Sequence, residues 1–273
     1  LTSLHSLTVG SNSLTSVTEL ELDESSELES SSIDDGSFSG VETLILGNST
    51  YQSRRLRDHR SRGHGWKPFG LEPHESGYSF NLDKKSLLRN VKKIDVRDNG
   101  FHDIHHFRLV GLEVVVIGRN SIHGREGQGA FVIESCTSIH TVSIGEGSFT
   151  HYHSLSLKHC GHLKEFRRDK MSFPSLRSIE MRSIGLMSFE IGHSEFTHLE
   201  SLVMDGLSGL NILRIGKGNG VKDIENGRFE ITNCGMMSSL VIEEGSFKFF
   251  GEVRIEKNVG LSEMEFGPWC FNR

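Results

Sequence analysis

The residues in this sequence with the clearest potential for chemistry are short clusters of histidine and cysteine. The densest cluster is His159-Cys160-Gly161-His162. A zinc site needs three or four nitrogen, sulfur or carboxylate ligands that converge on the ion at about 2.0–2.3 Å. The alternating pattern around the cluster predicts that Cys160 points inward from a strand, while the two histidines point outward. Because these ligands would diverge, we predict no metal site and interpret the histidines as polar surface residues.

Motifs of nucleophilic catalysis and phosphate binding are missing from the sequence. It contains neither a G-x-S-x-G nucleophile elbow nor a G-x-x-x-x-G-K-[ST] phosphate loop. The glycine-rich segment Gly216–Gly220 follows a turn of the repeat described below and precedes no predicted helix. We therefore predict a protein without catalytic activity and without a cofactor.

A stretch of basic and aromatic residues stands out in a chain whose net charge is −6. Between positions 54 and 67 six residues are Arg or Lys, whereas residues 1–53 contain neither. Such a stretch could grip nucleic acid, with phosphates neutralised by arginine and bases stacked on tryptophan. The acidic remainder of the chain and the lack of a nucleic-acid module favour a protein partner or an intramolecular lid instead. The candidate partner-binding residues of this stretch are Arg54, Arg55, Arg57, Arg60, Arg62 and Trp66.

These residues must be positioned by a repeated unit, which is the dominant feature of the sequence. A phrase of the form F-x-I-x-x-C-x-x-L-x-x-V-x-I-G-x-x-S-F recurs along the chain, and its clearest copy spans residues 131–149. The closing phenylalanines are 24 residues apart between Phe149 and Phe173, and 23 apart between Phe173 and Phe196. A period of about 20–50 residues indicates a solenoid, in which each coil buries its apolar face against its neighbours.

Each copy of the repeat contains two short alternating segments, which predict two strands per coil. The first is of the type Leu155-x-Leu157, and the second is of the type Val142-x-Ile144-Gly145. Alternation with period two puts the apolar residues on one face, and stacked coils would form two parallel ladders about 4.8 Å apart. The glycine after the second strand is expected to supply a turn with positive φ. We predict an all-β repeat solenoid of about ten coils of ~24 residues, with little or no α-helix.

The repeated L-x-L-x-x-C/N phrase resembles the leucine-rich repeat superfamily, and the I-G-x-x-S-F phrase is similar to a variant common in bacterial and protist surface proteins. The resemblance covers nearly the whole chain outside residues 47–78, which form an insertion loop. It implies that the first strand forms the concave ladder, and that its C/N position points inward and bonds turn backbone. It also implies an extracellular or cell-surface location. The residues at the C/N position are Cys136, Cys160, Cys234 and Asn258, and we expect the thiols to be free and buried.

Outward positions of the concave ladder carry recognition in leucine-rich repeats, so the resemblance implies a candidate surface. These positions are expected to be Glu21, Asn81, Arg108, Val132, Ser156, Glu180, Val203, Glu230 and Arg254. They are mixed in charge and size, and they lack the aromatic stripe typical of a binding hot spot. The charged candidates for partner binding on this surface are Glu21, Arg108, Glu180, Glu230 and Arg254.

The period runs from one end of the chain to the other, which predicts a single domain over residues 1–273. No apolar run reaches the roughly 18 residues of a membrane-spanning helix, and one glycosylation sequon begins at Asn48. Because the chain starts at Leu1 within a repeat, we expect a piece of a longer repeat protein. We predict a non-enzymatic protein-recognition or scaffold module with an unidentified protein partner. The alternative is a structural subunit that assembles head to tail, through uncapped end coils, into a filament or ring.

Overall fold

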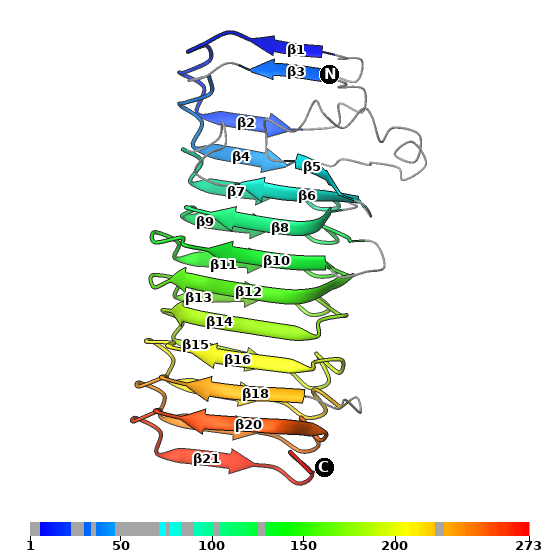
Figure 1. The fold of residues 1–273 in the computed structure, drawn as a ribbon, viewed down its shortest axis with the longest axis vertical. Helices are drawn as coiled ribbons and strands as arrows, with labels where there is room; N and C mark the ends of the chain where they lie inside the picture. Colours follow the sequence, from blue (N-terminus) through cyan, green and yellow to red (C-terminus); the bar gives the residue numbers. More distant parts are fainter. Residues whose placement is uncertain are drawn as a thin grey trace.

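The computed structural model shows an elongated stack of β-coils (Figure 1). It describes residues 6–22, 30–33, 37–46, 71–74, 77–82, 90–100, 104–124, 129–221 and 227–272. These residues form 21 β-strands, and no helix occurs among them. The strands lie across the long axis of the molecule and follow one another along it. The prediction of an all-β repeat solenoid is confirmed.

The first strands of successive coils form a nine-stranded sheet. One of the nine, β5 (Leu71–His74), pairs antiparallel with its neighbour at one edge, and the others run parallel. The segment 47–70 that precedes β5, most of the expected insertion loop, lies outside the described residues. The parallel strands are β6 (Gly77–Leu82), β8 (Ile104–Val110), β10 (Gly129–Glu134), β12 (Tyr152–Cys160), β14 (Ser178–Ile184), β16 (Ser201–Asp205), β18 (Gly227–Thr232) and β20 (Phe250–Glu256).

The second strands of the coils form the other ladder, which is divided into two parallel sheets. The six-stranded sheet contains β2 (Glu19–Leu22), β4 (Thr43–Leu46), β7 (Lys93–Val96), β9 (Val114–Ile117), β11 (Thr141–Ile144) and β13 (Glu165–Arg168). The four-stranded sheet contains β15 (Ser188–Ile191), β17 (Ile212–Ile215), β19 (Ser239–Ile242) and β21 (Glu263–Phe266). Two parallel ladders are therefore present as predicted, but one of them is interrupted between β13 and β15.

Two further strands at the N-terminal end, β1 (Ser6–Val9) and β3 (Ser30–Ile33), pair with each other in parallel. They are the first strands of the coils that continue into β2 and β4. The described residues form a parallel β-solenoid of about 8 turns, in rough agreement with the expected figure of about ten coils.

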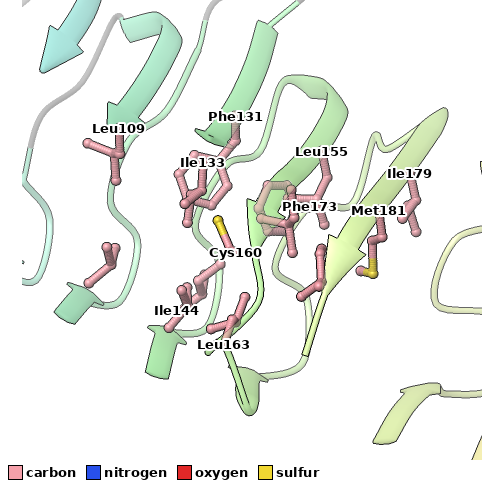
Figure 2. Close-up of a cluster of buried hydrophobic side chains, with 14 of the residues drawn as sticks. Leu109, Phe131, Ile133, Ile144, Leu155, Cys160, Leu163, Phe173, Ile179 and Met181 are labelled. Carbon is pink, nitrogen blue, oxygen red and sulfur yellow. The ribbon is translucent and has the colours of Figure 1, made fainter. Parts of the chain in front are cut away.

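The core lies between the two ladders and consists of inward side chains stacked from coil to coil (Figure 2). Phe149 stacks on Phe131 at 4.6 Å and on Phe173 at 4.5 Å between ring centroids, and all three rings are fully buried. Phe149 and Phe173 have positive φ, at 58° and 56°, a conformation that costs a non-glycine residue roughly 1–2 kcal/mol. Burying a whole phenylalanine side chain contributes roughly 1.5–3 kcal/mol. The S-F phrase thus marks a left-handed turn that directs the ring into the core.

The backbone conformation of the glycine after the second strand differs from the sequence-based expectation of positive φ. Gly145 and Gly216 do not have positive φ. A Cβ on Gly145 would lie 2.7 Å from the backbone of Arg119, and one on Gly216 would lie 2.8 Å from the backbone of Gly192. The expectation was wrong because this glycine is needed for close approach, since neighbouring turns pack backbone against backbone. Positive φ falls two residues later, as at Gly147 (φ 71°).

The C/N position of the first strand points inward and bonds the neighbouring coil. Asn258 Oδ1 accepts a hydrogen bond from the backbone N–H of Cys234 at 2.8 Å. The sulfur of Cys136 accepts a weaker one from the N–H of Leu112 at 3.4 Å. At these two positions the inward side chain therefore bonds the backbone of the neighbouring coil. All four cysteines are free thiols, with Cys136, Cys160 and Cys234 buried and Cys270 half-buried.

Candidate binding surface

The outward residues expected on the first ladder lie side by side in one row across the nine-stranded sheet. In register, Arg108 faces Val132, Ser156 faces Glu180, and Glu230 faces Arg254. The sheet therefore brings the row together as the sequence predicted. Its members are Asn81, Arg108, Val132, Ser156, Glu180, Val203, Glu230 and Arg254.

Glu21 is the exception, because it lies on the second ladder. It belongs to β2, where it pairs in register with Ile45, and its carboxylate lies 2.9 Å from the guanidinium of Arg97. Its assignment to the outward row was wrong, since both strands of a coil alternate with the same period and alternation alone does not distinguish them. The candidates of the basic stretch, Arg54, Arg55, Arg57, Arg60, Arg62 and Trp66, lie outside the described residues.

A second row of residues, two positions further along the strands, lies beside the first and carries most of the remaining charge. This second row was not predicted from the sequence, although residues on one face of a strand recur at every second position, and that spacing is the signal in the sequence that points to it. The members of this second row are Val110, Glu134, Lys158, Arg182, Asp205, Thr232 and Glu256.

Ion pairs join the two rows in the middle of the sheet. The Glu180 carboxylate accepts from Arg182 Nε at 2.6 Å and from Lys158 Nζ at 2.7 Å, and Arg182 also reaches Asp205 at 3.2 Å. Burial raises the pKa of Glu180, but the hydrogen bonds and charges of Arg182 and Lys158 outweigh burial, so the pKa lies below its ordinary value. The carboxylate therefore stays ionised at neutral pH.

Similar pairs occupy both ends of the sheet. Near β8, Arg108 lies 3.1 Å from Glu134. Near β20, the carboxylate of Glu230 lies between Arg228 and Arg254, and its side chain is only 7% exposed. The four candidates that lie on this sheet, Arg108, Glu180, Glu230 and Arg254, are thus held in fixed positions by neighbouring charges.

These ion pairs shape the surface more than they stabilise the fold. The side chains of Glu180 and Arg182 are 30% and 36% exposed, and pairs in contact with water contribute about 0–1 kcal/mol. Stability comes instead from the buried apolar column between the ladders.

The histidine–cysteine cluster is divided as the alternation predicts. Cys160 is buried while His159 and His162 are exposed. Hydrogen bonding from Cys160 lowers the pKa of Cys136 to about 7, and the same contact together with burial raises the pKa of Cys160. Both residues are fully buried, so their sulfurs do not meet solvent. Within the described ranges, no group of three or more His, Cys, Asp or Glu side chains is placed to hold a metal ion.

The glycine-rich segment contributes to packing between coils. Its Asn219 is fully buried, accepts a hydrogen bond from the N–H of Phe196 at 2.8 Å, and donates to the carbonyls of Gly192 and Gly216 at 2.8 Å each. The amide therefore ties its own turn to the turn of the preceding coil. Ser148 and Ser246 occupy the equivalent position in their own coils. Each hydroxyl donates to a backbone carbonyl of the preceding coil, that of Gly118 and that of Gly216 respectively.

Comparison with known proteins does not indicate a function for the outward face of the nine-stranded sheet. No family model, curated protein or solved structure matches the chain. In the part of the chain that the structure describes, no helix has the length and apolar character needed to cross a bilayer.

Proposed function

We propose that this chain is a non-enzymatic protein-recognition module of the leucine-rich-repeat kind, and that it binds a partner protein through the outward face of the nine-stranded sheet. The observation that carries the proposal is the pair of adjacent charged rows, held in register from β8 to β20.

Rigidity supports this surface as a binding site. Each inner strand of the sheet is paired on both sides, and its inward residues are fully buried, as Leu157 and Met181 are. The outward side chains are therefore presented on a backbone that cannot easily rearrange. A preorganised surface loses less conformational entropy on binding than a flexible one.

The pattern of charge supports specificity more than affinity. Positive and negative residues are interspersed in an irregular order along both rows, so a partner with the complementary pattern would dock in one register, whereas a shifted partner would meet like charges. Because the charges already pair with each other, a partner must share or replace those contacts. We therefore expect moderate affinity with strong dependence on ionic strength.

A charge reversal within the rows tests the proposal. Protein domains selected from a displayed library against the full chain should lose about tenfold or more in affinity when Arg182→Glu is introduced, a change of about 1.4 kcal/mol. Arg214→Glu is the matched control, because Arg214 is exposed on β17 of the other ladder. Selected domains that tolerate Arg182→Glu but not Arg214→Glu would contradict the proposal.

End-to-end assembly is a second candidate, favoured by the face of the last described coil. Its apolar side chains Val253, Met264, Phe266 and Trp269 are between 42% and 61% exposed. Strands β20 and β21 are each paired on one side only among the described residues. A further coil would cover this face, whether it came from a continuation of the chain or from a second copy.

Molecular mass across a dilution series tests this second candidate. Assembly predicts a mass that rises with concentration and returns to that of a monomer when Phe266→Lys is introduced. A mass independent of concentration would exclude assembly through this face.

A further inference from the structure

The interruption of the second ladder creates a site distinct from the charged sheet. Strand β13 pairs with β11, and β15 pairs with β17, but β13 and β15 do not pair with each other. On the other side of the same two coils, β12 and β14 pair from Ser154 with Ser178 to Cys160 with Ile184. The two coils therefore separate on one side only. We call the place between β13 and β15 the seam.

Backbone hydrogen bonds show how regular the ladder is on either side of the seam. In the preceding coil, the N–H of Asp169 donates to the carbonyl of Ile144 at 2.9 Å. In the following coil, the N–H of Gly216 donates to the carbonyl of Ile191 at 2.8 Å. The equivalent bond at the seam would run from Gly192 to Arg168.

At the seam a side chain replaces that ladder bond. The N–H of Gly192 donates instead to the carboxylate of Glu195 at 2.6 Å. A Cβ on Gly192 would lie 3.2 Å from this carboxylate, whereas one on Gly216 would lie 2.8 Å from the backbone of the preceding coil. The close backbone approach seen between other turns is thus lost here.

A charged pair in an apolar row explains the separation. Arg168 occupies the inward position that Ile144 holds in the coil before it, and its side chain is only 8% exposed. Its guanidinium pairs with Glu195, donates to the carbonyl of Glu190 at 3.0 Å, and lies 4.7 Å from the ring centre of Phe196. A buried charge needs such partners. The guanidinium occupies space in which the second ladder would otherwise close.

The seam opens into a groove of about 950 Å³, within the size range of sites that bind ligands. Apolar side chains contribute to both walls: Phe166, Met171 and Pro174 on the β13 side, and Phe189 on the β15 side. Met171 is 64% exposed. The groove thus combines apolar side chains with two strand edges that face each other.

We propose that the seam binds an extended peptide segment of a partner protein, which adds as a strand between β13 and β15. An unpaired strand edge presents main-chain donors and acceptors that match a peptide backbone, and here one edge lies on each side of the groove. On the β15 edge the Glu190 carbonyl and the Gly192 N–H already bond Arg168 and Glu195, so the peptide would exchange with these side chains there. Each edge is four residues long, or about 13 Å at the rise of a strand. The site therefore fits a short extended segment.

The side chains around the groove define the chemistry of that segment. An apolar side chain would pack against Phe166 and Phe189 at the inward position. Lys170 and Glu190 line opposite walls, and neither forms an ion pair with another described residue. A segment with an acidic residue toward Lys170 and a basic residue toward Glu190 would complement them. This site does not depend on the proposed function of the charged sheet.

A variant that restores the regular repeat tests the site by replacing the buried ion pair with the residue types of a regular coil. The double substitution Arg168→Ile with Glu195→Ser places in these two consecutive coils the residue types that Ile144 and Ser148 supply elsewhere in the repeat. We expect the seam to close and the urea unfolding midpoint to stay the same or rise. Phe166→Ser is the second variant, because it removes an apolar wall while leaving the ion pair in place.

Short random peptides displayed as a library and selected against the full chain serve as the probe, with affinity measured by fluorescence anisotropy. Selected peptides should bind at least about tenfold more weakly to either variant. They should also weaken by that factor when N-methylated at alternate residues, because methylation removes backbone donors. Binding to the Arg182→Glu protein should be unchanged.

Two results would overturn the proposal: selected peptides that all bind the double variant as tightly as the original chain, or N-methylated peptides with undiminished affinity. Loss of binding with Arg182→Glu alone would instead assign recognition to the charged sheet, so failure of the seam site is distinguishable from failure of the proposed function.

Discussion

One coil contains β12 and β13, and the next contains β14 and β15. These two coils pair with each other on one side and not on the other. On one side, β12 and β14 form a continuous part of the nine-stranded sheet. On the other, β13 and β15 belong to separate sheets. The stacking of coils on one side therefore does not force the other side to close. Each ladder depends on its own inward residues.

Two arginines illustrate the difference. Arg182 points outward from β14, where it is half-exposed and the sheet beneath it is unbroken. Arg168 takes an inward position on β13, where it is almost fully buried and the ladder is interrupted. The same residue type is tolerated at little cost on one face and alters the architecture on the other. A solenoid can thus acquire a groove through one charged pair in its inward rows.

The largest expected effect on stability comes from removing a ring of the aromatic column, the stacked and buried rings of Phe131, Phe149 and Phe173. Removing a ring at the seam is the comparison. Phe149→Ala should reduce the free energy of unfolding by about 3–5 kcal/mol, because it opens a cavity between stacked rings. Phe166→Ala should cost less, about 1–2 kcal/mol, because its half-buried ring borders the groove. Urea unfolding of both variants measures the difference. Equal losses would mean that the seam is as tightly packed as the column.

A second comparison removes one or both members of the buried pair. Arg168→Ala should cost about 3 kcal/mol, since it leaves the Glu195 carboxylate without its charged partner. The double variant Arg168→Ile with Glu195→Ser should be at least as stable as the original chain, because an apolar replacement of a buried pair is often neutral or stabilising. Urea midpoints distinguish the two. A double variant less stable than Arg168→Ala would show that the pair stabilises the coil.

The pH dependence of stability should report Glu195. Burial raises the pKa of Glu195. Hydrogen bonding and charge from Arg168, together with the N–H of Gly192, lower this pKa by more than burial raises it, so the pKa in the folded protein lies below the ordinary value. An unfolded glutamate titrates near about 4.3. The ionised carboxylate therefore stabilises the fold above about pH 4.3, and this stabilisation is lost as pH falls through the folded pKa.

Replacement of this glutamate provides the measurement. Glu195→Gln should be less stable than the original chain at neutral pH, and the gap between the two urea midpoints should narrow on acidification below about pH 4. A gap that stays constant down to acidic pH would show that the Glu195 charge does not contribute.

The smallest effect is expected on the charged sheet. Arg182→Ala should change the free energy of unfolding by less than about 1 kcal/mol, since its ion pairs are half-exposed and screened by water. Thermal or urea unfolding at low and high salt would check this. A loss comparable with that of Arg168→Ala would remove the distinction between outward and inward arginines.

Much of the architecture could be predicted from the sequence because the repeat encodes it locally. The 24-residue period and the alternation of Leu155 with Leu157 sufficed for two parallel ladders and for the outward row of the first. Glu21 was misplaced because both strands of a coil share that alternation. The glycine of the I-G phrase was predicted to supply positive φ, but it allows close approach of two backbones. That contact is with a neighbouring coil, so the sequence of a single repeat does not indicate it.

The seam had signals in the sequence that the period alone did not reveal. Arg168 stands where Ile144 stands in the preceding copy, Glu195 stands where Ser148 stands, and the interval from Phe173 to Phe196 is one residue short. Each deviation resembles ordinary repeat divergence when taken alone. Their meaning comes from proximity, since Arg168 and Glu195 belong to consecutive coils and meet only when the coils stack.

Amide hydrogen exchange, resolved to individual strands, tests the central claim most directly. Exchange requires opening of the hydrogen bond that protects each amide, so unpaired edges exchange fastest. We predict that β15 exchanges much faster than β17, while β14 is as protected as β16 on the opposite side of the same coils. Equal protection of β15 and β17 would contradict the account, because it would show that the second ladder is continuous in solution.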